Sequence, residues 1–588
     1  MNYITSTGAK QRPLRRQRRV NSPQLRLRKG SFKQVALQAR RWQSQPRRGC
    51  EGDGRLLKFN VCRDAAVCAV SAGGFFSVWD DVRKRRSGDP SYRPDSPRAF
   101  FECDCGEEAR ASPVLAPAEG RLRVAKYDVA IIGSGPGGYV AAIRAGELGL
   151  KTVVVEKDPY LGGTCLHVGC IPTKVLLHHA EVYDQFKNGA ELGFEVSGLK
   201  INWANVLARK DKIVKKHSKG IEFLFKKNKV EWVQGWGRYE GPGRVSVEKD
   251  GKKSEIEAAN ILMVSGSEAK SLPGIEPDHK TILTNRSILQ LPEIPKTLIV
   301  VGAGAVGVEF ASIYNSFGAQ VTILEALPRI VPVEDEEISA ELTKAFRKKG
   351  IQVFTSCAVE SVKKDAKGVI VAFKDKDGKA QTLQAEKLLL AVGRKAMTDG
   401  CGLEKSKAKV ERGFVHVGDN METAEKGLYA IGDIVAGLPQ LAHAAMMEGI
   451  IAVTHIAGKP THQIVKTRIP NATYCEPQIG SIGLTEKQAR DAGYDVKTGK
   501  FPFVGNSKAT ILGSHGGFVK VVSEESYGEV LGIHIIGPLA TELLAEAATV
   551  LNLEGTIDDM MNMVHAHPTV WEAMGDAFAS VRGLQINV

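Results

Sequence analysis

Cys165 and Cys170 stand in the segment GGTCLHVGCIPTK, residues 162–174, with four residues between them. Cysteines at this spacing could bind zinc, could be two buried thiols, or could form a disulfide that is oxidised and reduced in turn. A structural zinc site needs four ligands, and its cysteines usually come in paired clusters. His167 lies between the two cysteines and no second cysteine pair follows. The sequence therefore disfavours zinc and predicts no metal site.

The geometry of a helix decides between the remaining interpretations. Five residues of regular helix rise about 7.5 Å, whereas a disulfide needs Cα atoms within about 7 Å of each other. Gly169 permits the chain to bend between the cysteines, and Pro172 suits the first turn of a following helix. Cys170 would then lie at a helix N-terminus, where its thiolate is stabilised. This arrangement favours a redox-active disulfide over two unrelated buried thiols.

Thiol–disulfide exchange also needs a base that produces the attacking thiolate. The segment HAHPTVWE near the C-terminus contains His567 and Glu572. A carboxylate can hold an imidazole in the right tautomer and raise its basicity. The spacing of five residues is wrong for one face of an unbroken helix, so we expect the two side chains to meet only if Pro568 starts a new turn. His565 is expected to be structural.

The framework that positions this chemistry is expected to come from two segments, which repeat one strand–turn–helix–strand pattern. They are YDVAIIGSGPGGYVAAIRAGELGLKTVVVEK and TLIVVGAGAVGVEFASIYNSFGAQVTILEA. In each, three glycines allow a tight turn, close approach of a pyrophosphate and close helix–strand packing, and a glutamate follows 23 residues after the first glycine. These glycines are Gly133, Gly135 and Gly138 in the first segment and Gly302, Gly304 and Gly307 in the second.

The two glutamates, Glu156 and Glu325, stand where a carboxylate would accept hydrogen bonds from a ribose. A carboxylate at Glu325 would repel the extra phosphate of NADP, so NAD is favoured. Two dinucleotides in one chain suggest a flavin beside a nicotinamide. A third glycine turn, GLYAIGDIVAG, contains Asp433, which by itself is more often a loop cap than a ligand.

The net charge of +14 is concentrated in the first 50 residues. They hold 14 of the 80 basic residues and no acidic one, so the rest of the chain has 66 of each sign. Polyanion binding would belong to this tail and not to the folded part. Residues 1–125 lack sustained periodicity and are expected to be disordered. The ten cysteines form no disulfide framework, and no apolar run approaches the ~20 residues of a membrane span.

Two explanations of residues 1–125 remain open. The first 50 residues are rich in Arg and free of acid, like an organellar transit peptide. Alternatively, an upstream region is included in the reading frame, and translation starts at a non-ATG codon near Val124. The first explanation predicts a mitochondrial matrix or plastid protein. The second, which is slightly favoured, predicts a bacterial cytoplasmic protein.

Taken together, these motifs resemble the disulfide-reducing flavoenzymes, and dihydrolipoyl dehydrogenases most closely. The resemblance covers essentially all of residues 126–588, including FPFVGNSKA, GFVKVV and LGIHIIGPLATELLAEA. It implies an α/β fold with two Rossmann-like dinucleotide-binding domains, for FAD and NAD, and a C-terminal α+β interface domain. The implied ranges are 126–270 and 396–465 for FAD, 271–395 for NAD and 466–588 for dimerisation.

The resemblance also implies roles for single residues. Asp433 would contact the ribityl chain of the flavin, Lys174 would lie near the flavin ring, and Glu309 would pair with Lys174. Arg394 would mark the return from the NAD domain to the FAD domain. The implied assembly is a homodimer in which His567 serves the other subunit, with a lipoyl-bearing acyltransferase or H-protein as substrate.

Other functions stay open at this point. Glutathione reductase shares the cysteine plan but uses NADP, and mercuric reductase would carry a further cysteine pair at the C-terminus. A non-catalytic scaffold would have no need of the cysteines, the histidine and the glutamate. Four residues depart from the usual pattern of the resembled enzymes and are expected to alter packing or affinity: Ser265, Cys475, Gln478 and Trp571.

Overall fold

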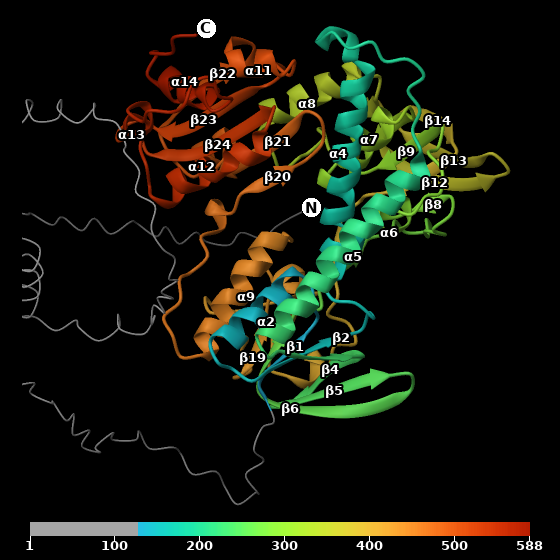
Figure 1. Ribbon diagram of the computed structural model, residues 1–588, viewed down its shortest axis with the longest axis vertical. Helices are drawn as coiled ribbons and strands as arrows, with labels where there is room; N and C mark the ends of the chain where they lie inside the picture. Colours follow the sequence, from blue (N-terminus) through green and yellow to red (C-terminus); the bar gives the residue numbers. More distant parts are fainter. Residues whose placement is uncertain (1–126, 588) are drawn as a thin grey trace, which may run out of the picture. The chain divides into compact units, whose positions relative to one another are not determined.

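The structure is a computed structural model that describes residues 127–587 (Figure 1). The expected basic extension, residues 1–125, lies outside the described residues. No helix in the described part is long and apolar enough to cross a membrane. The described chain contains the two repeated strand–turn–helix–strand units and a third, C-terminal sheet.

The first repeated unit is the centre of a mixed sheet. Continuous apolar runs form β1 (Tyr127–Ile132) and β2 (Thr152–Glu156), as expected for strands buried on both faces of a parallel sheet. α2 (Pro136–Glu147) connects them. The parallel order is β3-β2-β1-β6, and β19 pairs with the far side of β6, while β4 and β5 continue as an antiparallel meander. The remaining strands are β3 (Glu231–Gln234), β4 (Trp236–Gly241), β5 (Arg244–Lys249), β6 (Lys252–Met263) and β19 (Leu428–Ala430).

Helices cover this sheet and carry the cysteines. α2 packs closely on α9 (Ala442–Ile456), because a Cβ on Gly449 would lie 2.7 Å from the carbonyl oxygen of Gly137. α3 (Gly163–Val168), α4 (Cys170–Lys187) and α5 (Trp203–Lys227) follow β2 in the chain. In Figure 1, α4 extends from the first unit to the side of α7 in the second unit.

The second repeated unit is a parallel sheet in the order β11-β10-β9-β15-β8. β9 (Thr297–Val301), α7 (Ala305–Ser316) and β10 (Gln320–Leu324) repeat the first unit, and α8 (Glu336–Lys348) follows. The other elements are α6 (Asn285–Ile288), β8 (Ile282–Leu283), β11 (Gln352–Phe354), β15 (Lys387–Leu390) and an antiparallel sheet of β12 (Ala358–Asp365), β13 (Gly368–Lys374) and β14 (Ala380–Ala385).

Two short pairs of strands lie outside the main sheets. β7 (Ser267–Ala269) pairs with β16 (Arg394–Ala396) where the chain enters and leaves the second unit. β17 (Val410–Glu411) pairs with β18 (Phe414–Val415) shortly before the chain returns to the first sheet at β19.

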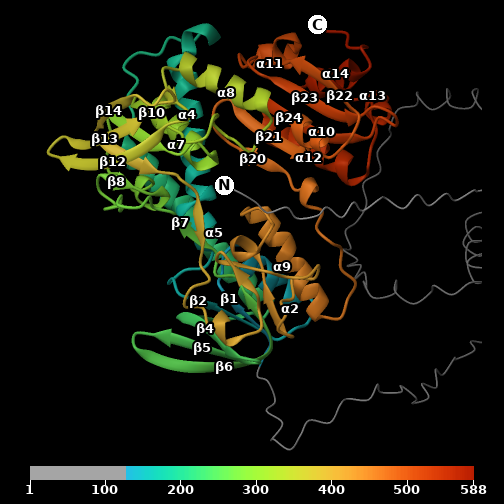
Figure 2. The ribbon, with the colours of Figure 1, turned by 180° about the vertical axis from the view of Figure 1, so that it is seen from behind.

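The C-terminal part is an antiparallel sheet in the order β20-β21-β24-β23-β22. Apolar residues of β23 and β24 alternate between its two faces, one packed on α12–α14 and the other toward α8. Figure 2 shows α8 beside this sheet from behind. Its elements are β20 (Asn471–Thr473), β21 (Gln478–Gly483), β22 (Val496–Pro502), β23 (Phe518–Glu524), β24 (Val530–Gly537), α10 (Glu486–Asp491), α11 (Ser507–Ile511), α12 (Ala540–Asn552), α13 (Ile557–Met561) and α14 (Glu572–Val581).

The expected fold class is therefore confirmed: two α/β units of the same plan precede an α+β unit. One apolar cluster runs through all three of them, and it includes Leu176 of α4, Phe310 of α7 and Phe518 of β23. The expected domain ranges stay predictions, since no boundary is marked independently of the sequence.

Candidate active site

The first glycine turn joins β1 to α2. A Cβ on Gly133 would lie 2.2 Å from the carbonyl oxygen of Val264, and one on Gly138 would lie 2.0 Å from that of Gly133. Neither position tolerates a side chain, because real Cβ atoms do not approach oxygen so closely. A Cβ on Gly135, in contrast, would have no heavy atom within 4 Å. The open backbone at the start of α2 fits a pyrophosphate, as a dinucleotide requires.

The second glycine turn joins β9 to α7 in the same way. A Cβ on Gly302 would lie 2.4 Å from the carbonyl oxygen of Ala391, and one on Gly307 would lie 2.0 Å from that of Gly302. A Cβ on Gly304 would again face open space. The two sequence repeats therefore have the same backbone geometry. The second turn fits a second dinucleotide.

The two glutamates make equivalent hydrogen bonds. Glu156 accepts the Ser134 N–H at 2.9 Å on one oxygen and the Asp158 N–H at 2.9 Å on the other. Glu325 accepts the Ala303 N–H at 2.6 Å and the Leu327 N–H at 2.8 Å in the same manner. Each carboxylate therefore ties the glycine turn to the loop that follows the second strand, at the place where a ribose would bind.

The cysteine segment lies against the first glycine turn. α3 ends at Val168, and α4 begins at Cys170, so the chain bends at Gly169 as the disulfide geometry requires. Both cysteines are free thiols and half-buried in the structure. Within residues 127–587, no cluster of His, Cys, Asp and Glu could hold a metal ion. Cys170 is the first residue of its helix, where the helix dipole favours a thiolate.

Gly169 is required by close contact. A Cβ there would lie 2.9 Å from the carbonyl oxygen of Thr164 and 3.2 Å from the Cα of Cys165. We expect Gly169→Ala to lower the free energy of unfolding by about 1–3 kcal/mol and to slow turnover, because the Cys165 backbone must shift. Gly220→Ala in α5 is the matched control, since nothing lies within 4 Å of its Cβ. Urea unfolding of the two variants checks this, and equal stability would contradict it.

Lys174 and Glu309 form an ion pair between α4 and α7. The Lys174 ammonium donates to both carboxylate oxygens of Glu309 at 2.8 Å. One of these oxygens also accepts the main-chain N–H of Tyr474 at 2.9 Å, and the Tyr474 ring lies 4.5 Å from the ammonium. The structure thus brings together the two residues that the resemblance paired, and it adds Tyr474, which was not expected there.

The lysine acts on the neighbouring thiol. In the dithiol, the hydrogen bond with Cys165 and then the positive charge of Lys174 lower the pKa of Cys170 to about 7, against the effect of burial. The same coupling raises the pKa of Cys165. Cys170 is therefore the thiolate of the pair, which is present above about pH 7 and is lost as the pH falls.

Two substitutions are expected to shift the pKa of Cys170 in opposite directions. Lys174→Met removes the charge that lowers the pKa of Cys170, so alkylation of the dithiol-reduced protein should require higher pH. Glu309 raises the pKa of Cys170, so Glu309→Gln should shift the alkylation profile to lower pH. Rates of iodoacetamide modification measured against pH check both. Shifts of the same sign in the two variants would contradict the electrostatic account.

Asp433 lies in the turn after β19. Its carboxylate accepts a hydrogen bond from the Ser267 hydroxyl and lies 3.6 Å from Nε of Arg394. Arg394 donates to the hydroxyl and the carbonyl oxygen of Ser267 at 2.6 Å. Ser267 therefore links the two residues that the sequence indicated, although the sequence itself singled out Ser265.

Glu448 of α9 lies beside this turn. It accepts the Gly432 N–H at 2.6 Å, but its other oxygen is buried without a partner among the described residues. Burial raises the pKa of Glu448 to about 7. A buried polar atom without a partner usually marks a missing ligand or water, so this oxygen fits a cofactor at the first turn.

His567 and Glu572 meet as the sequence required. His567 Nδ1 lies 2.7 Å from a Glu572 oxygen, and the Thr569 N–H donates to the other oxygen at 2.8 Å. Glu572 is the first residue of α14, which starts after Pro568. These two hydrogen bonds lower the pKa of Glu572 despite burial. In the described part of the chain no hydrogen bond joins His567 to either cysteine, and its side chain is 72% exposed.

A second histidine–glutamate pair joins the same loop to α12. His565 contacts Glu546 at 2.8 Å, and the Trp571 ring stacks on His565 with only 12° between the planes. A Cβ on Gly575 would lie 2.9 Å from the Trp571 ring, so Gly575 makes room for it. The unusual tryptophan therefore packs on the structural histidine and leaves the pair of His567 and Glu572 intact.

The other unusual residues make ordinary contacts. The Ser265 hydroxyl donates to the Met397 carbonyl at 2.6 Å, and the buried Cys475 thiol contacts the Pro477 carbonyl at 3.2 Å. Gln478 accepts the Thr541 hydroxyl at 2.9 Å. None of these contacts removes a group from the site.

Comparisons with known proteins agree with this geometry. Residues 127–449 match the model of the pyridine nucleotide-disulphide oxidoreductases, and residues 469–578 match the dimerisation domain of the same enzymes. The chain belongs to the pyridine nucleotide-disulphide oxidoreductase family. It is accordingly a flavoprotein oxidoreductase that uses FAD and NAD.

Individual members of this family are similar over nearly their full length. Dihydrolipoyl dehydrogenase of Bacillus subtilis is 42% identical over 473 residues, which are 79% of this chain and 99% of that protein. The mitochondrial dihydrolipoyl dehydrogenase of Pisum sativum is 40% identical over 454 residues, covering 76% of this chain and 90% of that protein. The crystal structure of LpdA from Mycobacterium tuberculosis superposes with a TM-score of 0.71 at 28% identity, covering 76% of this chain and 98% of that one.

Proposed function

We propose that this oxidoreductase is a dihydrolipoyl dehydrogenase, which oxidises protein-bound dihydrolipoamide to lipoamide and reduces NAD. The observation that carries the choice of substrate is the near-complete coverage of curated dihydrolipoyl dehydrogenases at 40–42% identity. The geometry supports the same choice, since Cys165 of α3 and Cys170 at the start of α4 lie in a segment that is hydrogen-bonded to the first glycine turn.

The cofactors divide between the two repeated units. FAD would bind at Gly133, Gly135, Gly138 and Glu156, in a domain made of residues 126–270 and 396–465, with Asp433 and Lys174 toward the flavin. NAD would bind at Gly302, Gly304, Gly307 and Glu325, in a domain made of residues 271–395. The bound flavin supplies the two-electron step that returns the dithiol to the disulfide and passes a hydride to NAD.

The residues of the chain perform the exchange with the substrate. His567 takes a proton from one thiol of dihydrolipoamide, and the resulting thiolate attacks the sulfur of Cys165. The Cys165–Cys170 bond breaks, so Cys170 leaves as a thiolate and the substrate is held as a mixed disulfide on Cys165. His567 is exposed and passes the first proton to solvent, after which it accepts the proton of the second substrate thiol. The thiolate so formed attacks the substrate sulfur of the mixed disulfide and releases lipoamide. Cys165 leaves as a thiolate and is protonated, so two electrons have passed to the cysteine pair.

Charges around the site support each role. The charge of Lys174 and the N-terminus of α4 stabilise the Cys170 thiolate, which makes it the better leaving group. Once Cys165 is a thiol again, its hydrogen bond adds to this stabilisation. The Glu572 carboxylate accepts from Nδ1 of His567, which leaves Nε2 as the base. Glu309 holds Lys174 in place through two hydrogen bonds.

The matched dimerisation domain indicates a homodimer. We infer that each site takes its base from the second copy, because His567 is exposed and unconnected to the cysteines of its own chain. The physiological substrate would be the lipoyl group of an acyltransferase or an H-protein. The cysteine segment favours a bacterial cytoplasm, and a transit peptide in residues 1–125 would instead place the enzyme in an organelle matrix.

Rapid mixing of the FAD-loaded protein, first with dihydrolipoamide and then with NAD, tests this function. We expect long-wavelength absorbance of a thiolate beside the flavin, followed by formation of NADH. If dihydrolipoamide leaves the flavin oxidised while NADPH reduces it and another disulfide is consumed, the substrate is wrong. The protein would then be a reductase of the glutathione type on the same fold.

A further inference from the structure

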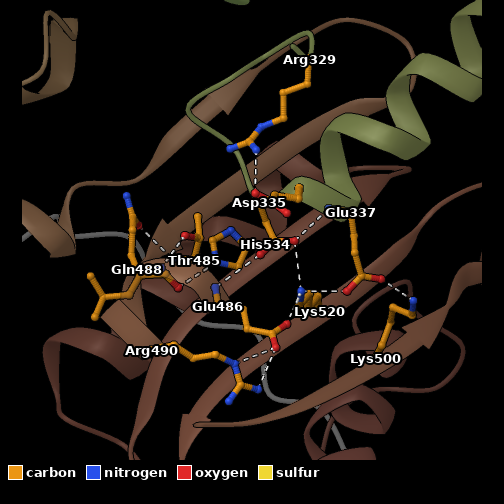
Figure 3. Close-up of polar contacts among 12 residues, drawn as sticks. Arg329, Asp335, Glu337, Thr485, Glu486, Gln488, Arg490, Lys500, Lys520 and His534 are labelled. Carbon is orange, nitrogen blue, oxygen red and sulfur yellow. Dashed lines mark hydrogen bonds and ion pairs between the residues drawn. The ribbon is translucent and has the colours of Figure 1, made fainter. Parts of the chain in front are cut away.

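A buried lysine of the third sheet is surrounded by carboxylates (Figure 3). Lys520 of β23 is 3% exposed, and its ammonium lies 2.8 Å from Glu337, 2.8 Å from Glu486 and 3.1 Å from Asp335. Asp335 is equally buried. A buried cation is tolerated only when it is paired and hydrogen-bonded, so these four residues act as one unit.

The members of this cluster come from two domains. Asp335 caps α8 of the second unit by accepting the Glu337 N–H at 3.1 Å. Glu486 starts α10 of the third unit, and its N–H donates to Asp335 at 3.4 Å. The cluster therefore fastens the start of α8 to the third sheet.

Directly before α8 lies the loop that follows Glu325. Its Leu327 N–H donates to Glu325 at 2.8 Å, and its Val331 N–H donates to the carbonyl oxygen of Ala303 in the second glycine turn at 2.8 Å. One end of the loop thus touches the residues that form the dinucleotide site. The other end is Asp335, which Lys520 holds.

The middle of this loop is strained. Val331 has a φ of 40° and is almost completely buried. The left-handed region is unfavourable for a β-branched residue, and such a conformation persists only where the surroundings enforce it. The fixed end at Asp335 and the hydrogen bond to Ala303 are two of the constraints on the loop, and the Ser339 hydroxyl adds another by donating to the Val331 carbonyl oxygen at 3.3 Å.

We propose that Lys520, although it lies in the dimerisation domain, is a positioning residue for NAD. By holding Asp335 it fixes the loop 326–334, and the loop in turn fixes Ala303 and Glu325 where the NAD ribose and pyrophosphate bind. This inference rests on the assignment of NAD to the second glycine turn. It predicts that a change in the third sheet weakens NAD binding without weakening the exchange with dihydrolipoamide.

Lys520→Met in the FAD-loaded full chain tests the proposal. We expect the Kd of NAD for the oxidised enzyme, measured by calorimetry, and the KM for NAD to rise roughly 10- to 100-fold, as for a displaced binding group. Flavin reduction by dihydrolipoamide without NAD should keep its rate within about twofold. Lys500→Met is the matched control, because Lys500 pairs with Glu337 at 2.6 Å but is half exposed; it should change neither quantity.

Lys520→Met leaves the buried carboxylate of Asp335 without the ammonium that pairs with it, so a second variant guards against misfolding. Lys520→Met combined with Asp335→Asn restores the charge balance and keeps a good helix cap, and it should still bind NAD weakly. Unchanged NAD affinity in the folded double variant would overturn the proposal, and so would an equal loss in both half-reactions. Failure of the wild-type protein to accept dihydrolipoamide would instead count against the proposed function.

Discussion

Replacing Cys165 with Ser should lower dihydrolipoamide oxidation by roughly 10⁴-fold or more, as when a covalent nucleophile is removed. The serine hydroxyl cannot form the disulfide that the substrate attacks. FAD should stay bound, because the first glycine turn is formed by other residues. Steady-state assays with dihydrolipoamide and NAD, together with the flavin content of the purified protein, check both parts.

Cys170→Ser is the informative companion of this variant. Both variants should be inactive with dihydrolipoamide, but they differ in the thiol that remains. Cys165→Ser keeps the helix-terminal thiol and a hydroxyl that can donate to it, so long-wavelength absorbance should persist near neutral pH. Cys170→Ser should lack this absorbance. The reverse pattern would exchange the roles of the two cysteines, and loss of FAD in Cys165→Ser would count against the whole assignment.

Replacing His567 with Gln should lower kcat/KM for dihydrolipoamide by about 10²–10⁴-fold, the usual contribution of a general base. Reduction of an artificial acceptor by NADH should be unaffected, because that path does not involve the cysteines. His565→Gln is the matched control, because His565 lies in the same loop and pairs with Glu546 of α12. This variant should change turnover only a few-fold. Comparable losses in the two variants would contradict the role of His567.

Mixing Cys165→Ser with His567→Gln tests whether each active site combines residues of both subunits. A Cys165→Ser subunit supplies an intact His567, and a His567→Gln subunit supplies intact cysteines. If each site uses the histidine of the partner subunit, mixed dimers have one working site, and random mixing restores about a quarter of the activity. If the site lies within one chain, mixing restores none.

Much of this site could be predicted from the sequence because its signals are local. The glycine turns and their glutamates repeat at 23 residues, and their backbone geometry repeats in the same way. The bend at Gly169 followed from the limits of disulfide geometry. The contact of His567 with Glu572 needed only a turn between residues five apart.

The other contacts of the site join residues that are far apart in the chain, and no local sequence pattern predicts them. Ser267 reaches Asp433 across 166 positions, and the Tyr474 N–H reaches Glu309 across 165. Lys520 reaches Asp335 across 185 positions. Its only local signal is a charged residue inside the apolar strand GFVKVV, which shows that a partner is needed but does not identify it.

The ion pair of Lys174 and Glu309 has a consequence for how such enzymes can diverge. Its carboxylate also binds the main chain of Tyr474, and the apolar cluster behind it contains residues of all three units. Each unit therefore contributes residues to a buried interface that is shared by all three. Recombination between relatives with a crossover near residue 466 would join surfaces that had not evolved together. We expect residues 127–587 to have been inherited as one block. Functional chimeras should require that all three units come from the same parent.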